Sequence, residues 1–377
     1  MKLVAAVRLL PTPKQAALLR ETLERCNAAC EWLARLGADA RVTRQFDLHK
    51  IGYAEMRARF GLAAQAAVRC ISKTADAFKV GDTCETRTFR RHAAQPFDER
   101  IFRFLPGRDA VSIWTLGGRQ VIPFACGERQ RGLLARARGQ VDPMFVRGKW
   151  MLAATCEATQ APLIGADDAI GIDVGIVNLA VTDAGVSYSG EAIERVRRRH
   201  HNRRRALQKR GTRSAKRALR RASGKQARFQ RATNHVLSKA IVADAERGRC
   251  LIALEDLGGI RQRVKAKRHQ RARMANWGFA ELRDLICYKA ALKGVAVVLV
   301  DPRDTSRRCP CCGLIDKKNR PDRDTFRCIG CGLAGPADHI AARNIRQRGL
   351  RARSFVMALQ GAASSLDSAS PEESRRL

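Results

Sequence analysis

The sequence predicts a multidomain α+β protein, and three observations lead to that prediction. Residues 1–10 and 87–160 form short alternating runs broken by Gly and Pro, the pattern of an antiparallel barrel or sandwich. Residues 165–303 alternate strand-like runs with long helical stretches, which is typical of a mixed α/β domain. Two CxxC pairs within residues 304–333 indicate a small metal-binding insertion, and residues 334–350 then complete the α/β domain.

The first part begins with a strand and continues into two helices, which we expect to form a bundle (residues 11–86) inserted into the β-rich domain. Thr12 is a good N-cap, and Gln15 completes a capping box with it. This helix is expected to end at Gly37. A second helix is expected over residues 62–79, where apolar residues recur at helical spacing.

The second part opens on the run GIDVGIVNLAV, where an apolar approach ends at Asp173 and a turn leads into a second strand. A buried strand is expected to end at Glu255, and a helix is expected over residues 277–292. The last helix is expected from about Asp338 to Arg348. Residues 351–377 are expected to be a largely disordered tail, because its last part, residues 361–377, is rich in Ser, Ala and Glu.

The formal net charge is +36, from 72 Lys and Arg against 36 Asp and Glu. Such a charge repels itself unless a polyanion neutralises it, so nucleic acid is the first partner to expect and an anionic membrane surface the second. No apolar run approaches the ~20 residues of a transmembrane helix, and the N-terminus lacks a signal-peptide pattern. We therefore expect a cytoplasmic protein that associates with the nucleoid through DNA.

Residues 195–231 contain seventeen Lys or Arg and no acidic residue. Scattered apolar residues on both sides of Gly211 and Gly224 favour a helical hairpin that lies on nucleic acid, although a solvated charged surface or a disordered basic segment would show the same composition. The candidate contacts to nucleic acid in this segment are Arg203, Arg204, Lys209 and Arg217.

The two CxxC pairs are Cys309 with Cys312 and Cys328 with Cys331, separated by fifteen residues. This is the spacing of a four-cysteine zinc ribbon, and four protein ligands leave no open position, so the zinc would be structural. Cys311 lies inside the first pair and is a possible substitute ligand.

Three acids are placed so that a mixed sheet would bring them together: Asp173, Glu255 and Asp338. Clustered carboxylates repel one another and are tolerated chiefly when divalent cations neutralise them. Two such cations can hydrolyse a phosphodiester, so in a chain of this charge the spacing favours a nuclease. Taken singly each acid is an ordinary cap or surface residue, and Asp338 alone would be read as an N-cap.

Five blocks together resemble, in order, the TnpB (OrfB) family of transposon-encoded RNA-guided nucleases, which are related to the type V CRISPR effectors. The blocks are GIDVGIVNLAV, ALEDLGGI, VLVDPRDTSRRCPCCG, the second CxxC pair and ADHIAARNI. The resemblance covers residues 165–350, and the N-terminal half resembles the family only in the order of its elements.

The resemblance implies a RuvC-type, RNase H-like nuclease domain that carries the zinc ribbon, preceded by a β-rich wedge domain with a helical insertion. It implies a Mg²⁺-dependent endonuclease, a guide RNA from the transposon end, and cleavage of double-stranded target DNA beside a short adjacent motif; a monomer is favoured. The catalytic acids would be Asp173, Glu255 and Asp338. Arg323 and Arg327 are candidates to steady the scissile phosphate. One position departs from the family, which usually has Asn two residues after the third acid, where this chain has Ile340.

Three other functions stay open from sequence. The chain would be an RNA-guided DNA-binding protein or repressor without cleavage if its site were inactive. A strand-joining DNA transposase also uses three acids on this type of fold. A generic RNA-binding protein would explain the charge but not the acids.

Overall fold

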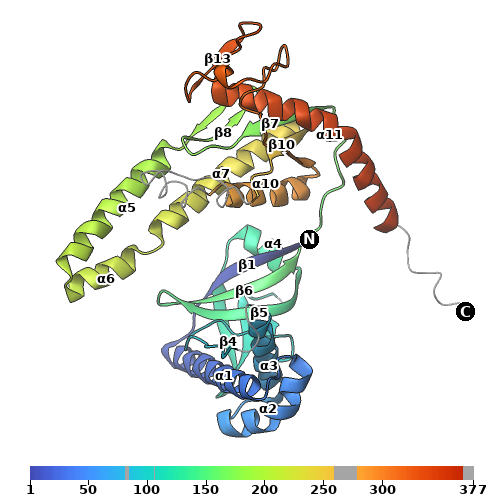
Figure 1. The fold of residues 1–377 in the computed structure, drawn as a ribbon. Coiled ribbons are helices and arrows are strands. Elements are labelled where there is room, and N and C mark those ends of the chain that lie inside the picture. Colours follow the sequence, from blue (N-terminus) through green and yellow to red (C-terminus); the bar gives the residue numbers. More distant parts are fainter. Residues whose placement is uncertain (81–84, 106, 259–277, 368–377) are drawn as a thin grey trace, which may run out of the picture. The chain divides into compact units, whose positions relative to one another are not determined.

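The computed structural model describes residues 1–80, 85–105, 107–258 and 278–367, with side chains described as far as residue 353. It is a mixed α/β chain that divides into two compact units, Met1–Thr159 and Gln160–Leu377 (Figure 1).

Unit 1 contains a six-stranded sheet in the order β2-β3-β4-β1-β6-β5, in which every neighbouring pair is antiparallel. The strands are β1 (Lys2–Leu9), β2 (Phe102–Phe104), β3 (Ala110–Thr115), β4 (Gly118–Ala125), β5 (Ala137–Val146) and β6 (Lys149–Glu157). The expected β-rich region is confirmed, and the N-terminal strand joins its middle. A short helix that was not predicted, α4 (Glu128–Leu134), connects β4 to β5.

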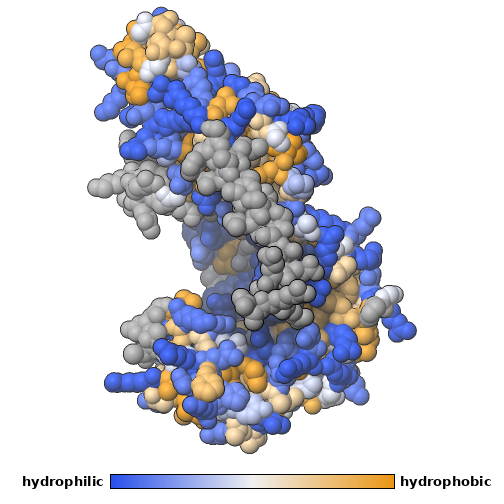
Figure 2. Space-filling model, turned by 90° about the vertical axis from the view of Figure 1, so that its right-hand side faces the viewer, coloured by the Kyte–Doolittle hydropathy of each residue, from blue (hydrophilic) through white to orange (hydrophobic). Residues whose placement is uncertain are grey.

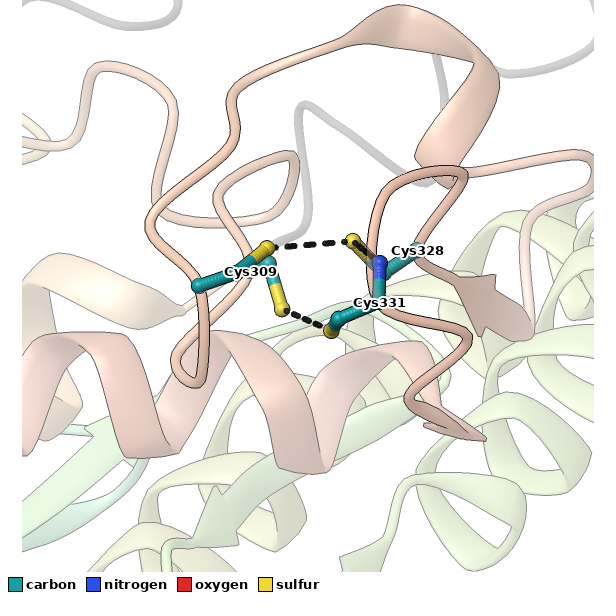
Figure 3. A group of neighbouring side chains, drawn as sticks. Cys309, Cys328 and Cys331 are labelled. Atoms are coloured by element: carbon teal, nitrogen blue, oxygen red, sulfur yellow. Dashed lines mark hydrogen bonds between the residues drawn. The ribbon is translucent and has the colours of Figure 1, made fainter.

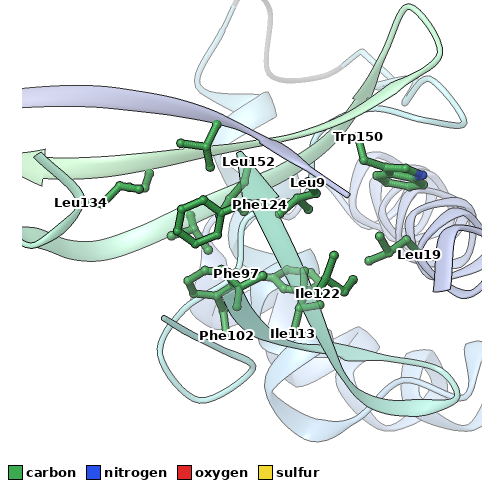
Figure 4. Close-up of a cluster of buried hydrophobic side chains, with 14 of the residues drawn as sticks. Leu9, Leu19, Phe97, Phe102, Ile113, Ile122, Phe124, Leu134, Trp150 and Leu152 are labelled. Atoms are coloured by element: carbon green, nitrogen blue, oxygen red, sulfur yellow. The ribbon is translucent and has the colours of Figure 1, made fainter. Parts of the chain in front are cut away.

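The inward residues of this sheet pack into one apolar cluster, which helix α1 closes at one side. Leu9 of β1, Leu152 of β6 and Leu19 of α1 are each at most 3% exposed, and Trp150 lies at the margin of the same cluster (Figure 4). The first strand is therefore held by neighbours that are more than a hundred residues distant in the chain.

Helices α1 (Pro13–Asp39), α2 (Gln45–Phe60) and α3 (Ala64–Phe78) form the bundle between β1 and β2. The capping box is confirmed, because the Gln15 backbone N–H donates to Thr12 Oγ1 and the Thr12 N–H donates to Gln15 Oε1. The predicted stop at Gly37 is wrong. A Cβ there would lie 2.7 Å from Leu48 Cδ2, so this glycine serves the close approach of α2 rather than a helix end.

Helix α2 was not predicted as a separate element. Its buried residues are Leu48, Gly52 and Met56, a line one residue wide with a glycine at its centre. Such a line gives little apolar periodicity, although each position packs against the neighbouring helices.

Unit 2 contains a five-stranded mixed sheet in the order β11-β10-β7-β8-β9. Its strands are β7 (Asp168–Asp173), β8 (Asn178–Thr182), β9 (Ser187–Ser189), β10 (Cys250–Glu255) and β11 (Val297–Val300). Strands β11, β10 and β7 are parallel to one another, with β11 at the edge of the sheet, whereas β8 and β9 run antiparallel to their neighbours.

Helices cover both faces of this sheet (Figure 1). Helices α7 (Lys225–Arg247) and α10 (Phe279–Lys293) pack on the face that presents Ile172 and Leu254. The other face presents Ala253 and packs against α11, which contributes Ile345.

Two more helices, α5 (Glu191–Arg210) and α6 (Arg213–Ala222), precede α7 and carry most of the basic segment. The chain turns at Gly211, between α5 and α6, and again at Gly224, between α6 and α7. Both glycines have positive φ. Helix α5 has no buried residue.

The last helix corrects an expectation. Helix α11 spans Ala337–Asp367, well beyond Arg348, so the tail expected to be disordered from residue 351 is helical to residue 367. Residues 351–367 contain four Ala and no proline, so their composition allows the helix to continue. Residues 368–377, the basic segment 261–273 and the predicted helix start at Trp277 lie outside the described residues.

Within the described ranges, no helix combines the length and apolar character that a membrane crossing needs. The face drawn in Figure 2 is mostly hydrophilic on both units. This agrees with a chain in which charged residues make up 29% of the sequence.

Candidate active site

Asp173 and Glu255 are the last residues of two adjacent parallel strands, β7 and β10. The register pairs Ile172 with Leu254, so the two acids follow at the same level of the sheet. Because side chains alternate along a strand, both acids point to the face opposite Ile172 and Leu254, which is the face that α11 covers.

Helix α11 packs closely against this face because residue 171 of β7 is a glycine. A Cβ on Gly171 would lie 2.1 Å from the Ala342 carbonyl oxygen, so only glycine allows the strand and the helix backbone to meet there. Asp173 lies two residues beyond this contact along the strand, about 7 Å. Asp338 lies four residues before it along the helix, about 6 Å. The contact therefore brings the third acid to the strand ends that carry the other two.

The three acids interact electrostatically. Burial and the negative charges of Glu255 and Asp338 raise the pKa of Asp173 to about 8, against a smaller opposing effect of Arg320. Burial also raises the pKa of Glu255, opposed by a hydrogen bond from Thr305. Two partly buried acids whose ionised forms are disfavoured form a site that a cation would stabilise.

Two of the acids, Glu255 and Asp338, are held by polar partners that the sequence did not reveal. Asn178 Nδ2 donates to Asp338 Oδ2 at 3.0 Å, and Thr305 Oγ1 donates to Glu255 Oε1 at 2.5 Å. Arg320 Nη2 lies 3.9 Å from Asp338 Oδ1. Asn178 and Thr305 do fall inside the quoted sequence blocks, which was the only signal available, whereas Arg320 lies in the ribbon outside them.

The arginines predicted to steady a phosphate lie elsewhere in the ribbon. Arg323 Nε is 3.9 Å from Asp324 Oδ1, and Arg327 is exposed on β12 (Thr325–Arg327). Neither lies within 4 Å of the three acids among the described ion pairs, whereas Arg320 does. Arg320 is thus the arginine beside Asp338 among the described ion pairs, and Arg348 acts on Glu255, whose pKa it lowers.

Ile340, the departure from the family pattern, is 2% exposed and packs with Cys309, Phe326 and Cys328. It joins α11 to the ribbon, so the apolar residue has a packing role. One turn later, Asn344 Nδ2 donates to the carbonyl oxygens of Thr305 and Arg308, which fixes the start of the ribbon on the same helix.

The four cysteines form a compact cluster on two facing loops (Figure 3). Their sulfur atoms all lie within 4.8 Å of one another, and the pairs Cys309–Cys331 and Cys312–Cys328 are 3.5 Å apart. A tetrahedral zinc with Zn–S distances of about 2.3 Å needs sulfur atoms about 3.8 Å apart, so the cluster fits that ion closely. Among the described residues the cysteine group is the one whose ligand atoms come this close together, and the three acids do not form such a group.

The two cysteine loops repeat one backbone pattern. Gly313 N–H donates to Cys309 O and Gly332 N–H to Cys328 O, both at 3.0 Å, and both glycines have positive φ. Hydrogen bonds from the backbone N–H groups of Cys331 and Gly330 lower the pKa of Cys328 to about 6, which favours the thiolate that binds a metal.

The predicted nucleic-acid contacts Arg203, Arg204, Lys209 and Arg217 are exposed on α5 and α6. None of the four lies within 4 Å of a carboxylate among the described residues. Two of them, Arg203 and Arg204, line a groove of about 310 Å³ together with Leu207 and Leu219. These four side chains therefore have no counterion among the described residues, whereas Arg197 and Arg198 of α5 are paired with Glu194.

Comparison with known proteins gives a consistent relationship. Residues 279–345 match the family model described as "Cas12f1-like, TNB domain". The chain is 32% identical over 217 residues to the CRISPR-associated endodeoxyribonuclease Cas12f1 of Sulfoacidibacillus thermotolerans, an alignment that covers 53% of this chain and 50% of that protein. It is 32% identical over 134 residues to the TnpB-like protein MJ0751 of Methanocaldococcus jannaschii, covering 35% and 48%.

The putative RNA-guided DNA endonuclease InsQ of Escherichia coli K12 is 27% identical over 222 residues, covering 54% of each chain. This chain therefore spans about half the length of the curated relatives it matches. Among solved structures, the cryo-EM structure of a Cas12f1–sgRNA–target DNA complex has a TM-score of 0.40 at 16% identity, covering 92% of this chain and 99% of that one.

Proposed function

Because this chain is related to the TnpB and Cas12f proteins, we propose that it is an RNA-guided DNA endonuclease associated with a transposable element. It hydrolyses phosphodiester bonds of target DNA next to a short adjacent motif. Unit 2 is a RuvC-like, RNase H-like nuclease domain in this proposal, formed by residues 165–303 and 334–350.

One observation carries the proposal: Asp173, Glu255 and Asp338 meet at the carboxyl ends of parallel strands, in a chain whose net charge is +36. A purely structural group of acids would be paired with Lys or Arg in so basic a protein. Here burial raises the pKa values of Asp173 and Glu255 instead, which supports a site built to hold cations.

The residues fit divalent magnesium, which prefers oxygen ligands and carboxylates in particular. Asp173, Glu255 and Asp338 would hold it, and when bound it supplies an activated water and charge stabilisation at the leaving oxygen. Thr305 orients Glu255, and Asn178 orients Asp338. The Arg320 guanidinium beside Asp338 binds a non-bridging oxygen of the scissile phosphate.

The other parts take supporting roles in the proposal. Zinc bound by Cys309, Cys312, Cys328 and Cys331 stabilises the ribbon (residues 304–333), which carries Arg320. The wedge domain (residues 1–10 and 87–160) and the helices of residues 11–86 hold the guide RNA and read the adjacent motif, while base pairing selects the target. The basic face on α5 and α6 follows the backbone of the guide–target duplex.

The test is cleavage of a guide-matched, motif-bearing DNA by the purified chain with its co-purified RNA and Mg²⁺. We expect cutting by the natural chain and loss of about 10³-fold or more in Glu255→Gln, because that change removes a ligand charge from the site.

The matched control is Asp256→Asn, which changes the neighbouring carboxylate. Asp256 is 58% exposed and accepts a hydrogen bond from the Gly258 N–H, away from the acids, so activity should persist. Guided binding without cutting by the natural chain would identify an RNA-guided binding protein, and joined DNA strands without a bound RNA would identify a transposase. Either result contradicts the proposal.

A further inference from the structure

Unit 1 contains a groove with no assigned role, at the end of the sheet where β1 leads into α1. Its volume is about 380 Å³, and its lining includes Arg8, Arg20, Phe145, Lys149 and Trp150. We call it the Trp150 groove. Its size is that of a pocket for one small ligand, about 300–1,000 Å³, and it is too small to take a nucleic-acid duplex.

One hydrogen-bond donor of the groove has no acceptor. Trp150 is 5% exposed, and its buried indole Nε1–H has no acceptor among the described residues. Figure 4 shows that the indole nitrogen lies at the end of the ring that points away from the apolar cluster. Buried N–H groups are almost always paired in folded proteins, and an indole can only donate, so the missing partner is an acceptor.

The groove also has positive charge without counterions. Arg8, Arg20 and Lys149 line it, no acidic residue does, and no carboxylate lies within 4 Å of these three cations in the described part of the chain. The groove therefore combines a hydrogen-bond donor without an acceptor and three cations without acidic partners, which together favour an anion as its ligand.

Two aromatic rings complete the surface. Phe145 and Trp150 are opposite each other on β5 and β6, with ring centroids 5.1 Å apart, and the Arg20 guanidinium lies 5.2 Å from the Phe145 centroid. Cations beside aromatic rings are the elements from which proteins build sites for single-stranded nucleic acid.

We propose that the Trp150 groove binds a backbone phosphate of single-stranded nucleic acid, with the indole N–H and the three cations as its ligands. The assignment of an occupant in the working complex, guide RNA or an opened DNA strand, rests on the proposed function, but the binding site itself does not. Its test measures binding only and stays valid if the chain does not cut DNA.

The experiment measures the affinity of the full chain for a fluorescein-labelled oligouridine and for the matching oligodeoxythymidine by anisotropy, at several NaCl concentrations. Trp150→Phe keeps the ring and removes the donor. We expect it to weaken binding about tenfold, the effect of one hydrogen bond to a charged acceptor. Its salt dependence should stay that of the natural chain, because no charge changes. The oligonucleotide whose affinity falls identifies RNA or DNA as the ligand.

A charge pair on one strand gives the second measurement. Arg8 and Lys2 lie on the same exposed face of β1, but only Arg8 lines the groove, and Lys2 is about 20 Å away along the strand. Arg8→Ala should reduce the slope of log affinity against log salt by about 0.7, and Lys2→Ala should leave it unchanged. If the melting curve of Trp150→Phe shows that this variant does not fold, the comparison of Arg8→Ala with Lys2→Ala still tests whether the groove binds the phosphate.

The proposal is overturned if Trp150→Phe binds both oligonucleotides within about twofold of the natural chain. It is equally overturned if Arg8→Ala and Lys2→Ala have the same effect, since general attraction to a basic surface would then explain all the binding.

Discussion

The surroundings of each acid, more than its type, decide which residues can hold a metal. Asp301 follows β11 as Glu255 ends β10, and β11 is parallel to its neighbour. Yet Asp301 accepts hydrogen bonds from the Arg303 side chain and backbone, which lower its pKa to about 2. The exposed Asp301 carboxylate is thus already paired with the Arg303 guanidinium. Glu255 instead lies partly buried and close enough to Asp173 to raise the pKa of that acid, and its own pKa is raised by burial, so Glu255 gains more from a cation than Asp301 does.

The raised pKa of Asp173 predicts that the free energy of unfolding of the metal-free protein decreases as pH rises. Its pKa is about 8 in the folded chain and near 3.8 when exposed, so the folded state binds the extra proton between these values. Stability is therefore lost as pH rises from about 4 to about 8. Asp173→Asn removes this loss and should raise the free energy of unfolding by a few kcal/mol at pH 8, with little effect at pH 4.

Melting curves in EDTA across this pH range provide the measurement. Mg²⁺ should stabilise the natural chain at pH 8 and have a much smaller effect on Asp173→Asn. If the variant and the natural chain show parallel pH profiles in EDTA, Asp173 is not the buried acid described here.

Thr305 gives a second prediction for a single residue. Thr305→Val keeps the shape of this 3% exposed side chain but removes the hydroxyl that holds Glu255. We expect the Mg²⁺ concentration for half-maximal cleavage to rise about tenfold, because partners that orient metal ligands contribute about 10–100-fold to affinity. Thr305→Ser should restore it. A loss of cleavage that saturating Mg²⁺ does not reduce would show that Thr305 acts otherwise.

Among the elements, α11 has the decisive position, because the strand meets it at Gly171. Gly171→Ala places a Cβ 2.1 Å from the Ala342 carbonyl oxygen, and backbone on both sides prevents relief by a side-chain rotation. The helix must move, so we expect a loss of about 3 kcal/mol in stability and of most cleavage activity. Denaturant unfolding measures the first.

Gly132→Ala is the matched control. Gly132 lies in α4, and a Cβ there meets nothing within 4 Å. It should leave stability unchanged or raise it by about 0.5–1 kcal/mol, since alanine restricts the unfolded chain. Similar destabilisation by both changes would contradict the role of the Gly171 contact.

The four-cysteine cluster of the ribbon predicts that each chain binds one zinc ion. Cys312→Ser and Cys311→Ser alter neighbouring exposed cysteines, but only Cys312 belongs to the four-sulfur cluster. We expect about one zinc per chain in the natural protein and in Cys311→Ser, and much less in Cys312→Ser, by elemental analysis after dialysis. Zinc retained equally by both variants would show that Cys311 replaces its neighbour.

The elements show how far sequence patterns reach. Capping residues and CxxC spacing predicted α1 and the cysteine cluster, because each pattern depends on residues close in sequence. The meeting of Asp173, Glu255 and Asp338 was expected from where each acid lies on its own strand or helix, although the three are more than eighty residues apart. Gly37 and Arg320 could not be interpreted in this way. The role of Gly37 depends on its contact with Leu48 of another helix, and the role of Arg320 depends on its proximity to Asp338. Such contacts leave no local pattern in the sequence.

At the scale of the whole molecule, the excess charge is divided unequally between paired and unpaired cations. The helices of unit 1 pair many of theirs within one turn, as Arg25 does with Glu21 and Arg35 with Glu31. Helices α5 and α6 hold a basic run with no acid between residues 195 and 231. Only the unpaired charge should release counterions when a polyanion binds.

This division predicts the salt dependence of binding. Removing Arg203, Arg204, Lys209 and Arg217 together by alanine substitution lowers the net charge by four, and we expect the slope of log affinity against log salt for duplex nucleic acid to fall by about 3.6. The control removes four cations that have acidic partners one turn away, which are Arg25, Arg35, Arg59 and Lys79. Both variants have the same net charge, so a general attraction would reduce their slopes equally. If α5 and α6 form the binding face, the first variant loses the slope and the control keeps most of it, because its lost cations were already neutralised within their own helices.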